Sequence, residues 1–297
     1  MNVSQAGNPA AQPRRIPFSI AMLPYVALHL GCLGVFATGF TRTGLAIGGV
    51  TFLARMFFMT AGYHRYFAHR SYKTSRWFQF LLGLGGTMGL QRGVLWWAQT
   101  HRYHHRHADT ELDLHSPHFQ GFWYSHCGWF FHADHRETDH SAVPDLAKFP
   151  ELVWLDGDLP CILVPTVTGL ALALLYGWEG VVWGVCVSTV AVWQITHWVQ
   201  SFSHSWRGYR RFATKDETRN HWLLGVLSLG EFHNNHHASP GSAKQGVSWW
   251  ELDICYGILK LLSWTGLIWD LRAAQRHTLE QPEESVQLSG APSNPRA

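Results

Sequence analysis

Three clusters of histidine mark this 297-residue chain, which contains 20 histidines in all. The first cluster has the form H-x-x-x-x-H, and the second and third both have the form H-x-x-H-H. Their members are His64 and His69; His101, His104 and His105; and His233, His236 and His237. Neutral imidazole binds Zn, Cu, Fe and Ni alike, so the clusters indicate metal binding without naming the metal. A lone histidine such as His29 or His277 is better explained as an ordinary polar residue.

The spacing within each cluster limits how its side chains can meet. On an α-helix, positions i, i+3 and i+4 share one face, so each H-x-x-H-H can direct three imidazoles at one point. Positions i and i+5 do not share a face, so His64 and His69 need either a local break in the helix or two different metal ions. Eight histidines also exceed the needs of one tetrahedral zinc ion. The clusters therefore predict two metal ions.

Other catalytic and metal-binding motifs are absent or incomplete. The soluble di-iron carboxylate design needs two Glu-x-x-His motifs and two further glutamates. The chain has one such motif, Glu137 to His140, which we attribute to chance. The zinc-protease H-E-x-x-H, the phosphate-binding glycine loops and Gly-x-Ser-x-Gly do not occur. The five cysteines form no C-x-x-C pair and are interpreted as buried thiols in a reducing compartment.

The composition indicates contact with lipid. Only 14% of the residues are charged, 46% are hydrophobic, and the chain has 16 Trp, 17 Phe and 9 Tyr. The mean hydropathy of −0.08 is low for a protein made only of membrane helices, so a large polar part must lie outside the bilayer. The formal net charge of +3 is too small and too dispersed to indicate a nucleic-acid-binding protein.

Four apolar runs are each close to the roughly 20 residues that cross a bilayer as a helix. They cover residues 17–40, 44–63, 161–177 and 181–202. Arg55 interrupts the second run, at a cost of about 3 kcal/mol on insertion scales, and a buried soluble hairpin is the alternative for the first two runs. The stretch from Trp77 to Trp97 is apolar but rich in glycine and contains Arg92, so it suits an interfacial or buried segment better than another span.

These runs predict an all-α integral membrane protein with four transmembrane helices in two hairpins. Loops rich in Lys and Arg stay in the cytoplasm, and in this arrangement Arg42 alone falls on the side away from the other basic loop residues. We therefore expect a multi-pass protein of the cell (inner) membrane, with both termini and all three histidine clusters in the cytoplasm. Residues 17–275 are expected to form one membrane domain, between a cytoplasmic tail at 1–16 and a disordered tail at 276–297.

Around the histidine clusters the chain resembles the membrane acyl-CoA desaturases, the family of stearoyl-CoA desaturase. The matching segments are TAGYHRYFAHRSYKTS at 60–75, WWAQTHRYHHRHADTELDLHSP at 96–117 and GEFHNNHHASP at 230–240. The resemblance runs from about residue 17 to residue 272. It implies four membrane helices under a histidine-rich cytoplasmic cap that holds a di-iron site.

The resemblance also implies a ligand set. Nine histidines would hold the two irons, namely the eight above and His204 in WVQSFSH. Where the family has an asparagine that reaches one iron through water, this chain has Gln200, which can make the same hydrogen bonds with a longer arm. Asp109, Glu111 and Asp113 are interpreted as acceptors that orient the ligand histidines or contact the head group, or else as an acidic turn exposed to solvent.

The acyl chain is expected to lie in a bent tunnel. The resemblance places Trp97 and Thr196 at the bend, with Gln91 supporting them, although Trp97 could also be an ordinary interfacial tryptophan. Animal members carry charged residues just before the second cluster that help to hold CoA, and this chain has Gln99 and Thr100 there. The acyl carrier, CoA or a membrane lipid, therefore stays open.

Removal of hydrogen from a saturated acyl chain requires oxidative chemistry. An unactivated methylene has no acidic proton, so acid–base side chains cannot remove its hydrogens, whereas a metal centre that uses O₂ can. The resemblance implies an O₂-dependent desaturase that forms a cis double bond, with position nine expected. Because the chain has neither a His-Pro-Gly-Gly haem signature nor a cysteine set for an iron–sulfur cluster, a separate ferredoxin- or cytochrome-type donor with its reductase is implied. The alternatives are a fatty-acid or alkane hydroxylase on the same scaffold, and a non-catalytic metal transporter or sensor.

Overall fold

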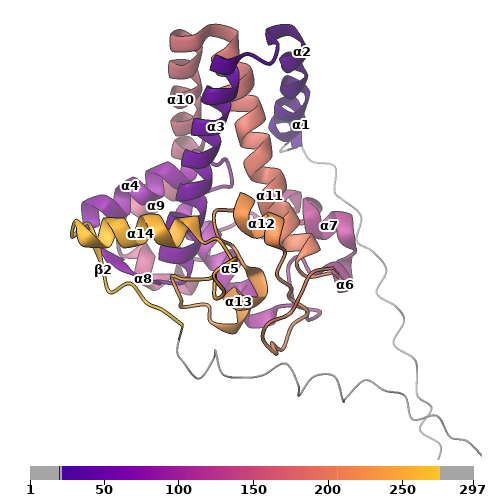
Figure 1. The fold of residues 1–297 in the computed structure, drawn as a ribbon, viewed down its shortest axis with the longest axis vertical. Coiled ribbons are helices and arrows are strands. Elements are labelled where there is room, and N and C mark those ends of the chain that lie inside the picture. The colour runs from indigo at the N-terminus through magenta and orange to yellow at the C-terminus, as the bar shows by residue number, and fades with distance from the viewer. Residues whose placement is uncertain (1–19, 21, 206, 275–297) are drawn as a thin grey trace, which may run out of the picture.

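The computed structural model describes residue 20 and residues 22–205 and 207–274, so both expected tails lie outside the described part. In Figure 1 the described part consists of a tall stalk of long helices above a broad base of short helices and loops. Apart from one two-stranded sheet, its regular elements are helices. The helical fold class predicted from the sequence is confirmed.

Apolar helices build the stalk. In chain order they are α1 (Met22–Gly31), η1 (Cys32–Gly34), α2 (Val35–Thr38), α3 (Arg42–Phe57), the π-helix η2 (Phe58–Ala68), α10 (Asp158–Glu179), the π-helix η6 (Gly180–Val187) and α11 (Ser188–Phe202). Two continuous stretches are long and apolar enough to cross a membrane, namely Arg42–Ala68 with 27 residues and Asp158–Phe202 with 45 residues. The first run, Met22–Thr38, is apolar but shorter.

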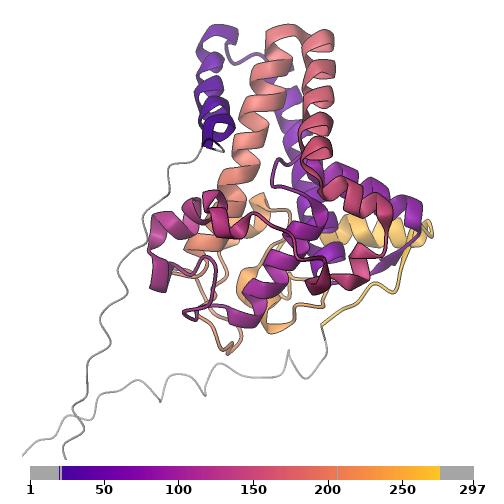
Figure 2. The same ribbon diagram turned by 180° about the vertical axis from the view of Figure 1, so that it is seen from behind.

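The 45-residue stretch reverses direction at Gly177. This glycine has a φ of 59° and a ψ of −139°, a backbone conformation that a residue with a Cβ rarely adopts. Figures 1 and 2 both show α10 and α11 running side by side in opposite directions. A Cβ at Gly180 would overlap the carbonyl of Leu172, so only glycine allows this close approach of the two arms. The reversal lies between the predicted runs 161–177 and 181–202, which agrees with the second of the two predicted hairpins.

Arg55 lies inside the helix bundle. It is 1% exposed, and its Nε donates to the carbonyl of Met88 at 3.0 Å. Its Nη1 donates to the carbonyl of Gly184 at 2.7 Å and also to the hydroxyl of Ser188. A cation that faces the bundle interior and is satisfied there is tolerated in an apolar helix. Arg55 therefore does not argue against placing α3 among lipid tails.

Short helices and loops make up the base. They are β1 (Lys73–Thr74), α4 (Arg76–Thr87), α5 (Val94–His107), α6 (Pro117–Gln120), α7 (Phe122–His126), η3 (Gly128–Phe131), η4 (Ala133–His135), η5 (His140–Ala142), α8 (Pro144–Ala147), α9 (Pro150–Asp156), α12 (Trp222–Leu227), α13 (His233–Ala238), α14 (Ile254–Trp264) and β2 (Ile268–Trp269). The strands β1 and β2 pair antiparallel, with Lys73 opposite Trp269. All five cysteines are free thiols, as predicted, but only Cys186 and Cys255 are buried, so the expectation that all five are buried is wrong.

Helix α4 packs across the helix formed by α3 and η2. Its glycines allow this, because a Cβ at Gly85 or Gly86 would overlap the ring of Phe58 or Tyr63. At the other side of α4 the side chain of Trp77 is 57% exposed. With 12 residues, α4 is too short to span a bilayer. Helix α4 therefore agrees with the interfacial or buried segment that the sequence predicts for the stretch from Trp77 to Trp97.

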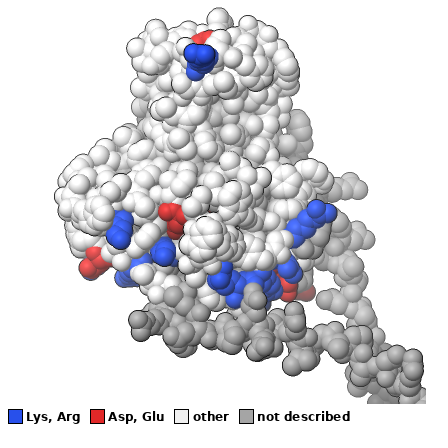
Figure 3. All heavy atoms as spheres, in the orientation of Figure 1, with Lys and Arg blue, Asp and Glu red and all other residues white. Residues whose placement is uncertain are grey.

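The surface of the stalk differs from that of the base. Figure 3 shows Lys, Arg, Asp and Glu gathered on the base, whereas the stalk is almost free of them except at its tip. Large apolar side chains on the stalk are exposed, among them Phe36 at 80% and Leu174 at 78%. An apolar surface of this kind requires a partner other than water. We conclude that the stalk faces lipid and that the chain is a membrane protein.

The two helical glycines Gly86 and Gly257 give a matched test of this packing. Gly86→Ala should destabilise the protein by about 1–3 kcal/mol, because the added methyl group meets the fully buried ring of Tyr63. Gly257→Ala in α14 should leave stability unchanged or raise it by about 0.4–1 kcal/mol, since nothing lies within 4 Å of its new methyl group. Thermal unfolding midpoints of the two variants in detergent check this. Equal midpoints would contradict the packing of α4.

Candidate metal centre

Five histidines converge at the junction of the stalk and the base. They are His64, His69, His101, His105 and His236, and one ring nitrogen from each lies within 4.8 Å of those of the others. Four Nε2 to Nε2 distances within this first group are 2.8 to 3.0 Å: His69 to His101, His105 to His236, His64 to His236, and His101 to His105. The ring nitrogens thus surround a single point.

A second group of four histidines lies beside the first. It consists of His104, His204, His233 and His237. The Nε2 atoms of His204 and His233 are 2.8 Å apart. The Nε2 atoms of His104 and His237 are buried and have no hydrogen-bond partner. The structure therefore brings together all eight histidines of the three clusters and His204, in one group of five and one of four.

A π-helix explains how His64 and His69 reach the same group. Residues Phe58–Ala68 form η2, in which backbone hydrogen bonds join residues five apart. The amide of His69 accordingly donates to the carbonyl of His64 at 3.2 Å. Residues five apart are one turn apart in such a helix, so both imidazoles point the same way. The spacing left two options, a local break in the α-helix or two different metal ions. The structure shows the first, because η2 is a π-helix.

The two H-x-x-H-H clusters each contribute to both groups. On α5, His101 and His105 belong to the first group while His104 belongs to the second. On α13, His236 belongs to the first group while His233 and His237 belong to the second. The expectation that each cluster directs three imidazoles at one point is wrong. Residues four apart share a group, and the remaining histidine is turned far enough around the helix to reach the neighbouring group.

Carboxylates hold the second nitrogen of several imidazoles. The Nδ1 atoms of His64, His104, His204 and His237 lie 2.8 to 3.0 Å from carboxylate oxygens of Glu231, Asp113, Asp109 and Asp216, respectively. Glu231 also lies 3.5 Å from Nδ1 of His233, so one carboxylate contacts a histidine of each group. An ionised carboxylate only accepts hydrogen bonds. Each of these Nδ1 atoms therefore carries a hydrogen, which leaves a lone pair on Nε2 of every imidazole that is neutral.

This tautomer offers the Nε2 lone pairs to a metal ion. The Nε2 atoms of His204 and His233 are 2.8 Å apart. Burial alone would lower the pKa of His204, but the neighbouring carboxylate of Asp109 raises it, so either a proton or a metal ion can join these two nitrogens. Burial, followed by the charge of His237, lowers the pKa of His105 well below its usual range, so added protons are disfavoured there. A metal ion in each group would accept these lone pairs. Nitrogen donors with no thiolate suit Zn, Cu, Fe or Ni, so the residues fit a pair of such metal ions.

The acidic turn after α5 is only partly engaged in the centre. Asp109 and Asp113 orient His204 and His104, as the first of the sequence interpretations proposed. Burial alone would raise the pKa of Asp109, but the neighbouring His204 and several hydrogen bonds lower it to about 2. Glu111 is exposed, which agrees with the alternative interpretation of an acidic turn that faces solvent.

Sequence reasoning did not identify four polar residues of the centre. Glu231 and Asp216 hold the histidines described above, and the amide of Gln245 lies 3.1 Å from Nδ1 of His236. The ring of His115 stacks on that of His104 at 4.3 Å between centroids. Glu231 lies two residues before the third cluster and could have been noticed there. Asp216 lies 21 residues before His237 and has no local signal.

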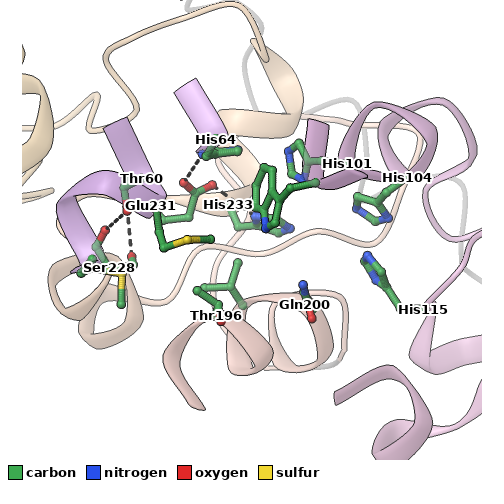
Figure 4. A pocket seen from close by; sticks show the side chains of 14 residues that line it. Thr60, His64, His101, His104, His115, Thr196, Gln200, Ser228, Glu231 and His233 are labelled. Carbon is green, nitrogen blue, oxygen red and sulfur yellow. Dashed lines mark hydrogen bonds and ion pairs between the residues drawn. The ribbon is translucent and has the colours of Figure 1, made fainter. Parts of the chain in front are cut away.

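A cavity adjoins the two groups. It is lined by Met56, Met59, Thr60, His64, Trp97, His101, His104, His115, Thr196, Val199, Gln200, Ser228, Glu231 and His233. In Figure 4, Thr196 and Gln200 lie on one side of it and His64, His101 and His104 on the other. The indole nitrogen of Trp129 donates to Oε1 of Gln200 at 3.3 Å. The cavity thus has apolar residues at one end and the histidine groups along one wall.

The three residues expected at the bend of the acyl tunnel are joined by hydrogen bonds. Nε2 of Gln91 donates to the hydroxyl of Thr196 at 2.8 Å, and Nε1 of Trp97 lies 3.5 Å from Oε1 of Gln91. Thr196 comes from α11 and Trp97 from α5, so Gln91 links the two walls of the cavity. Trp97 also stacks on His101 with their ring centroids 4.8 Å apart.

Comparison with known proteins agrees with this geometry. Residues 42–263 match a family model described as fatty acid desaturase. The chain is 36% identical over 259 residues to the sn-1 stearoyl-lipid 9-desaturase of Anabaena variabilis, which covers 85% of this chain and 93% of that protein. It is 38% identical over 231 residues to the sn-2 palmitoyl-lipid 9-desaturase of Nostoc sp. (strain 36), which covers 75% and 80%. It is also 33% identical over 252 residues to the acyl-CoA C20 Delta5-desaturase of Anemone leveillei, with 82% and 78% covered.

Two carboxylates should affect metal binding differently. Asp216→Asn should weaken binding in the four-histidine group by about 10–100-fold, because Asp216 holds only His237. Glu231→Gln should weaken both groups, because Glu231 contacts His64 and His233. Metal analysis after dialysis against a chelator should give fewer than two ions per chain for both variants, with the lower content for Glu231→Gln.

The adjacent carboxylate Glu217 provides the control. Its side chain is 54% exposed and pairs with Arg210 away from the histidines, so Glu217→Gln should keep the metal content of the unmodified protein. An equal loss of metal in Glu217→Gln and Asp216→Asn would contradict the role of Asp216.

Proposed function

The chain belongs to the fatty acid desaturase family, and we propose that it introduces a cis double bond at carbon 9 of a saturated acyl chain carried by a membrane lipid. Family membership makes it an oxidoreductase that acts on fatty acids. The observation that carries the finer proposal is the cavity whose wall is formed by the two histidine groups. Two of the relatives described above act, by their names, at position 9 of lipid-bound acyl chains.

The nine histidines are proposed to hold two irons. His64, His69, His101, His105 and His236 would bind one iron, and His104, His204, His233 and His237 the other. Gln200 is proposed to reach the second iron through a water molecule, which its place on the cavity wall supports. Two bound irons would supply the activation of O₂ that removal of hydrogen from an unactivated methylene requires. Asp109, Asp113, Asp216 and Glu231 keep the imidazoles oriented throughout.

The cavity wall is proposed to determine which carbons are oxidised. An acyl chain in this cavity would pass between Trp97 and Thr196, beside the histidines. Gln91 bonds Thr196 and lies close to the indole nitrogen of Trp97, so the bend keeps its shape without a bound substrate. Met56 and Met59 line the apolar part and exclude water. Fixing two adjacent methylenes against the metal centre is the chief contribution of these residues.

A lipid is favoured over CoA as the carrier. Oε1 of Gln99 accepts a hydrogen bond from the amide of Asp139 at 2.6 Å, and Thr100 is 7% exposed. Neither residue carries a charge that could bind the phosphates of CoA. The acyl-CoA desaturase of Anemone leveillei keeps CoA as the other candidate carrier.

The stalk is proposed to cross the cell membrane four times. Support comes from the reversal at Gly177, which makes two arms of the 45-residue stretch, and from the two apolar runs Met22–Thr38 and Arg42–Ala68. The gathering of Lys and Arg on the base supports a cytoplasmic location for the base and its histidines. Electrons are proposed to come from a separate ferredoxin- or cytochrome-type donor. A hydroxylase or a metal transporter gains no support from the relatives, whose names describe desaturases.

The function can be tested in cells that lack their own desaturase. Expression of the chain should produce cis-9 monounsaturated acyl chains, located by gas chromatography with mass spectrometry of derivatised double bonds. His104→Ala should abolish them, because it removes a buried member of the four-histidine group, whereas His118→Ala at an exposed site should not. Hydroxy fatty acids in place of alkenes would contradict desaturation.

Thr196→Val tests the bend of the cavity. The exchange keeps the shape but removes the hydroxyl that accepts from Gln91, so the rate should fall about 2–10-fold, the range that loss of one hydrogen bond allows. Double bonds at neighbouring positions should also appear, while the metal content should stay unchanged. Thr166→Val, on the exposed face of α10, is the matched control and should give the unmodified product pattern. Equal product patterns for both variants would rule out a role for Thr196 in regioselectivity.

A further inference from the structure

A second pocket lies in the base, between the end of η2, the strands β1 and β2, and the segment that joins α8 to α9. Its volume is about 360 Å³. None of the residues that line it also lines the cavity beside the histidines. Five of its lining residues are cations, and it is called the basic pocket below. They are Arg70, Lys73, Arg76, Lys148 and Arg272.

Cations outnumber carboxylates around the basic pocket. No acidic residue is among the described residues that line it. Three carboxylates outside the lining pair with cations: Asp145 with both Arg70 and Arg102, Asp270 with Lys73, and Glu151 with Arg76. Lys148 and Arg272 have no ion pair within the described part of the chain, and both are exposed. The basic pocket therefore keeps a net positive charge.

A buried amide without a partner also lines the basic pocket. Gln79 is 4% exposed, and its Oε1 accepts a hydrogen bond from the hydroxyl of Tyr66 at 2.8 Å. Its Nε2 is buried and has no hydrogen-bond partner. A buried donor left in this state is costly, so it favours a ligand that brings an acceptor. The first turn of α4 adds to this preference, because Arg76 at its start lines the pocket and the N-terminal end of a helix favours negative charge.

We propose that the basic pocket binds the phosphate group of an anionic membrane phospholipid. A phosphate group combines negative charge with several acceptor oxygens. Lys148 and Arg272 supply the unpaired positive charge, and Nε2 of Gln79 supplies the unpaired donor. The proposal goes beyond the proposed function, because this lipid would hold the base against the membrane at a site separate from the acyl cavity.

The place of the basic pocket in the fold favours a lipid as the source of the phosphate. Helices α4 and α14 lie in the upper part of the base, close to where the stalk emerges (Figure 1). Trp77 on α4, Trp264 on α14 and Trp269 on β2 are exposed, and tryptophan is enriched at membrane surfaces. Trp269 itself lines the pocket, and Trp77 follows Arg76. A bilayer around the stalk would bring head groups to this level, and basic pockets beside membrane helices bind anionic ones.

The chain carries a competing source of negative charge. Residues 275–297, which lie outside the described part, include Glu280, Glu283 and Glu284 and follow closely after Arg272. The experiment must therefore separate a lipid from this acidic segment and from soluble phosphate compounds.

The test uses the full-length, metal-loaded protein in a neutral detergent, with bound lipids counted by native mass spectrometry. The probes are phosphatidylglycerol, phosphatidylcholine and glycerol phosphate. Lys148→Gln with Arg272→Gln removes the two unpaired cations of the basic pocket. Lys215→Gln with Arg207→Gln is the matched control, because both residues are exposed, have no ion pair within the described part and do not line the pocket. Gln79→Leu removes the buried donor without a change of charge.

Phosphatidylglycerol should bind the unmodified protein at least about tenfold more tightly than phosphatidylcholine, because the choline cation is repelled by the basic pocket. The pocket pair should weaken phosphatidylglycerol binding by at least about tenfold, and the control pair by less than about twofold. Gln79→Leu should weaken it by about 3–10-fold through loss of one hydrogen bond to a charged group. A diffuse attraction between the base and anionic lipid would not respond to Gln79→Leu. Metal content should stay unchanged in every variant.

Equal weakening by the pocket and control pairs, or equal affinity for the two lipids, would overturn the proposal. Glycerol phosphate that binds as tightly as phosphatidylglycerol, and is lost in the pocket pair, would overturn a lipid as the source of the phosphate. Phosphatidylglycerol binding that appears only after removal of residues 275–297 would overturn the proposal in favour of the acidic segment. If Gln79→Leu folds poorly, the pocket pair still decides. Since binding is measured without turnover, the result does not depend on the proposed function.

Discussion

The convergence of imidazole lone pairs is the constraint on which this structure depends. Carboxylates accept hydrogen bonds from Nδ1 of at least four histidines. The Nε2 atoms of these histidines therefore point inward at one another. A metal ion in each of the two groups would accept these lone pairs and hold the imidazoles together. Four carboxylates orient these imidazoles: Asp109 and Asp113 after α5, Asp216 in a distant loop and Glu231 before α13. This arrangement indicates a fold built around metal ions.

The fold meets this constraint with a few specific devices. The π-helix η2 turns His64 and His69 toward one point, and α5 and α13 divide their histidines between two points. Arg65, fully buried on η2, pairs with Asp253 at 2.9 Å and donates to the carbonyls of Gly230 and Ala243. This ties the segment that carries the third cluster to the helix that carries the first. The helices η2 and α11 continue from the stalk into the base, where Met59 and Val199 line the cavity beside His64.

The sequence predicted the histidine clusters, the apolar runs and the turn between α10 and α11 because each depends on residues close together in the chain. It did not predict how the histidines divide, because that depends on how far each side chain is rotated about its helix relative to two neighbouring points. The role of Asp216 could not be predicted either, since its contact with His237 is made by the fold. His204 was reached through family resemblance alone, and its contacts with Asp109 and His233 explain why a single histidine belongs with the clusters.

The most direct test of the metal centre is a crystal structure of the iron-loaded protein with diffraction data collected on both sides of the iron absorption edge. The account predicts two anomalous peaks per chain, one among His64, His69, His101, His105 and His236 and the other among His104, His204, His233 and His237. A single peak, or peaks coordinated by the carboxylates in place of the Nε2 atoms, would contradict it.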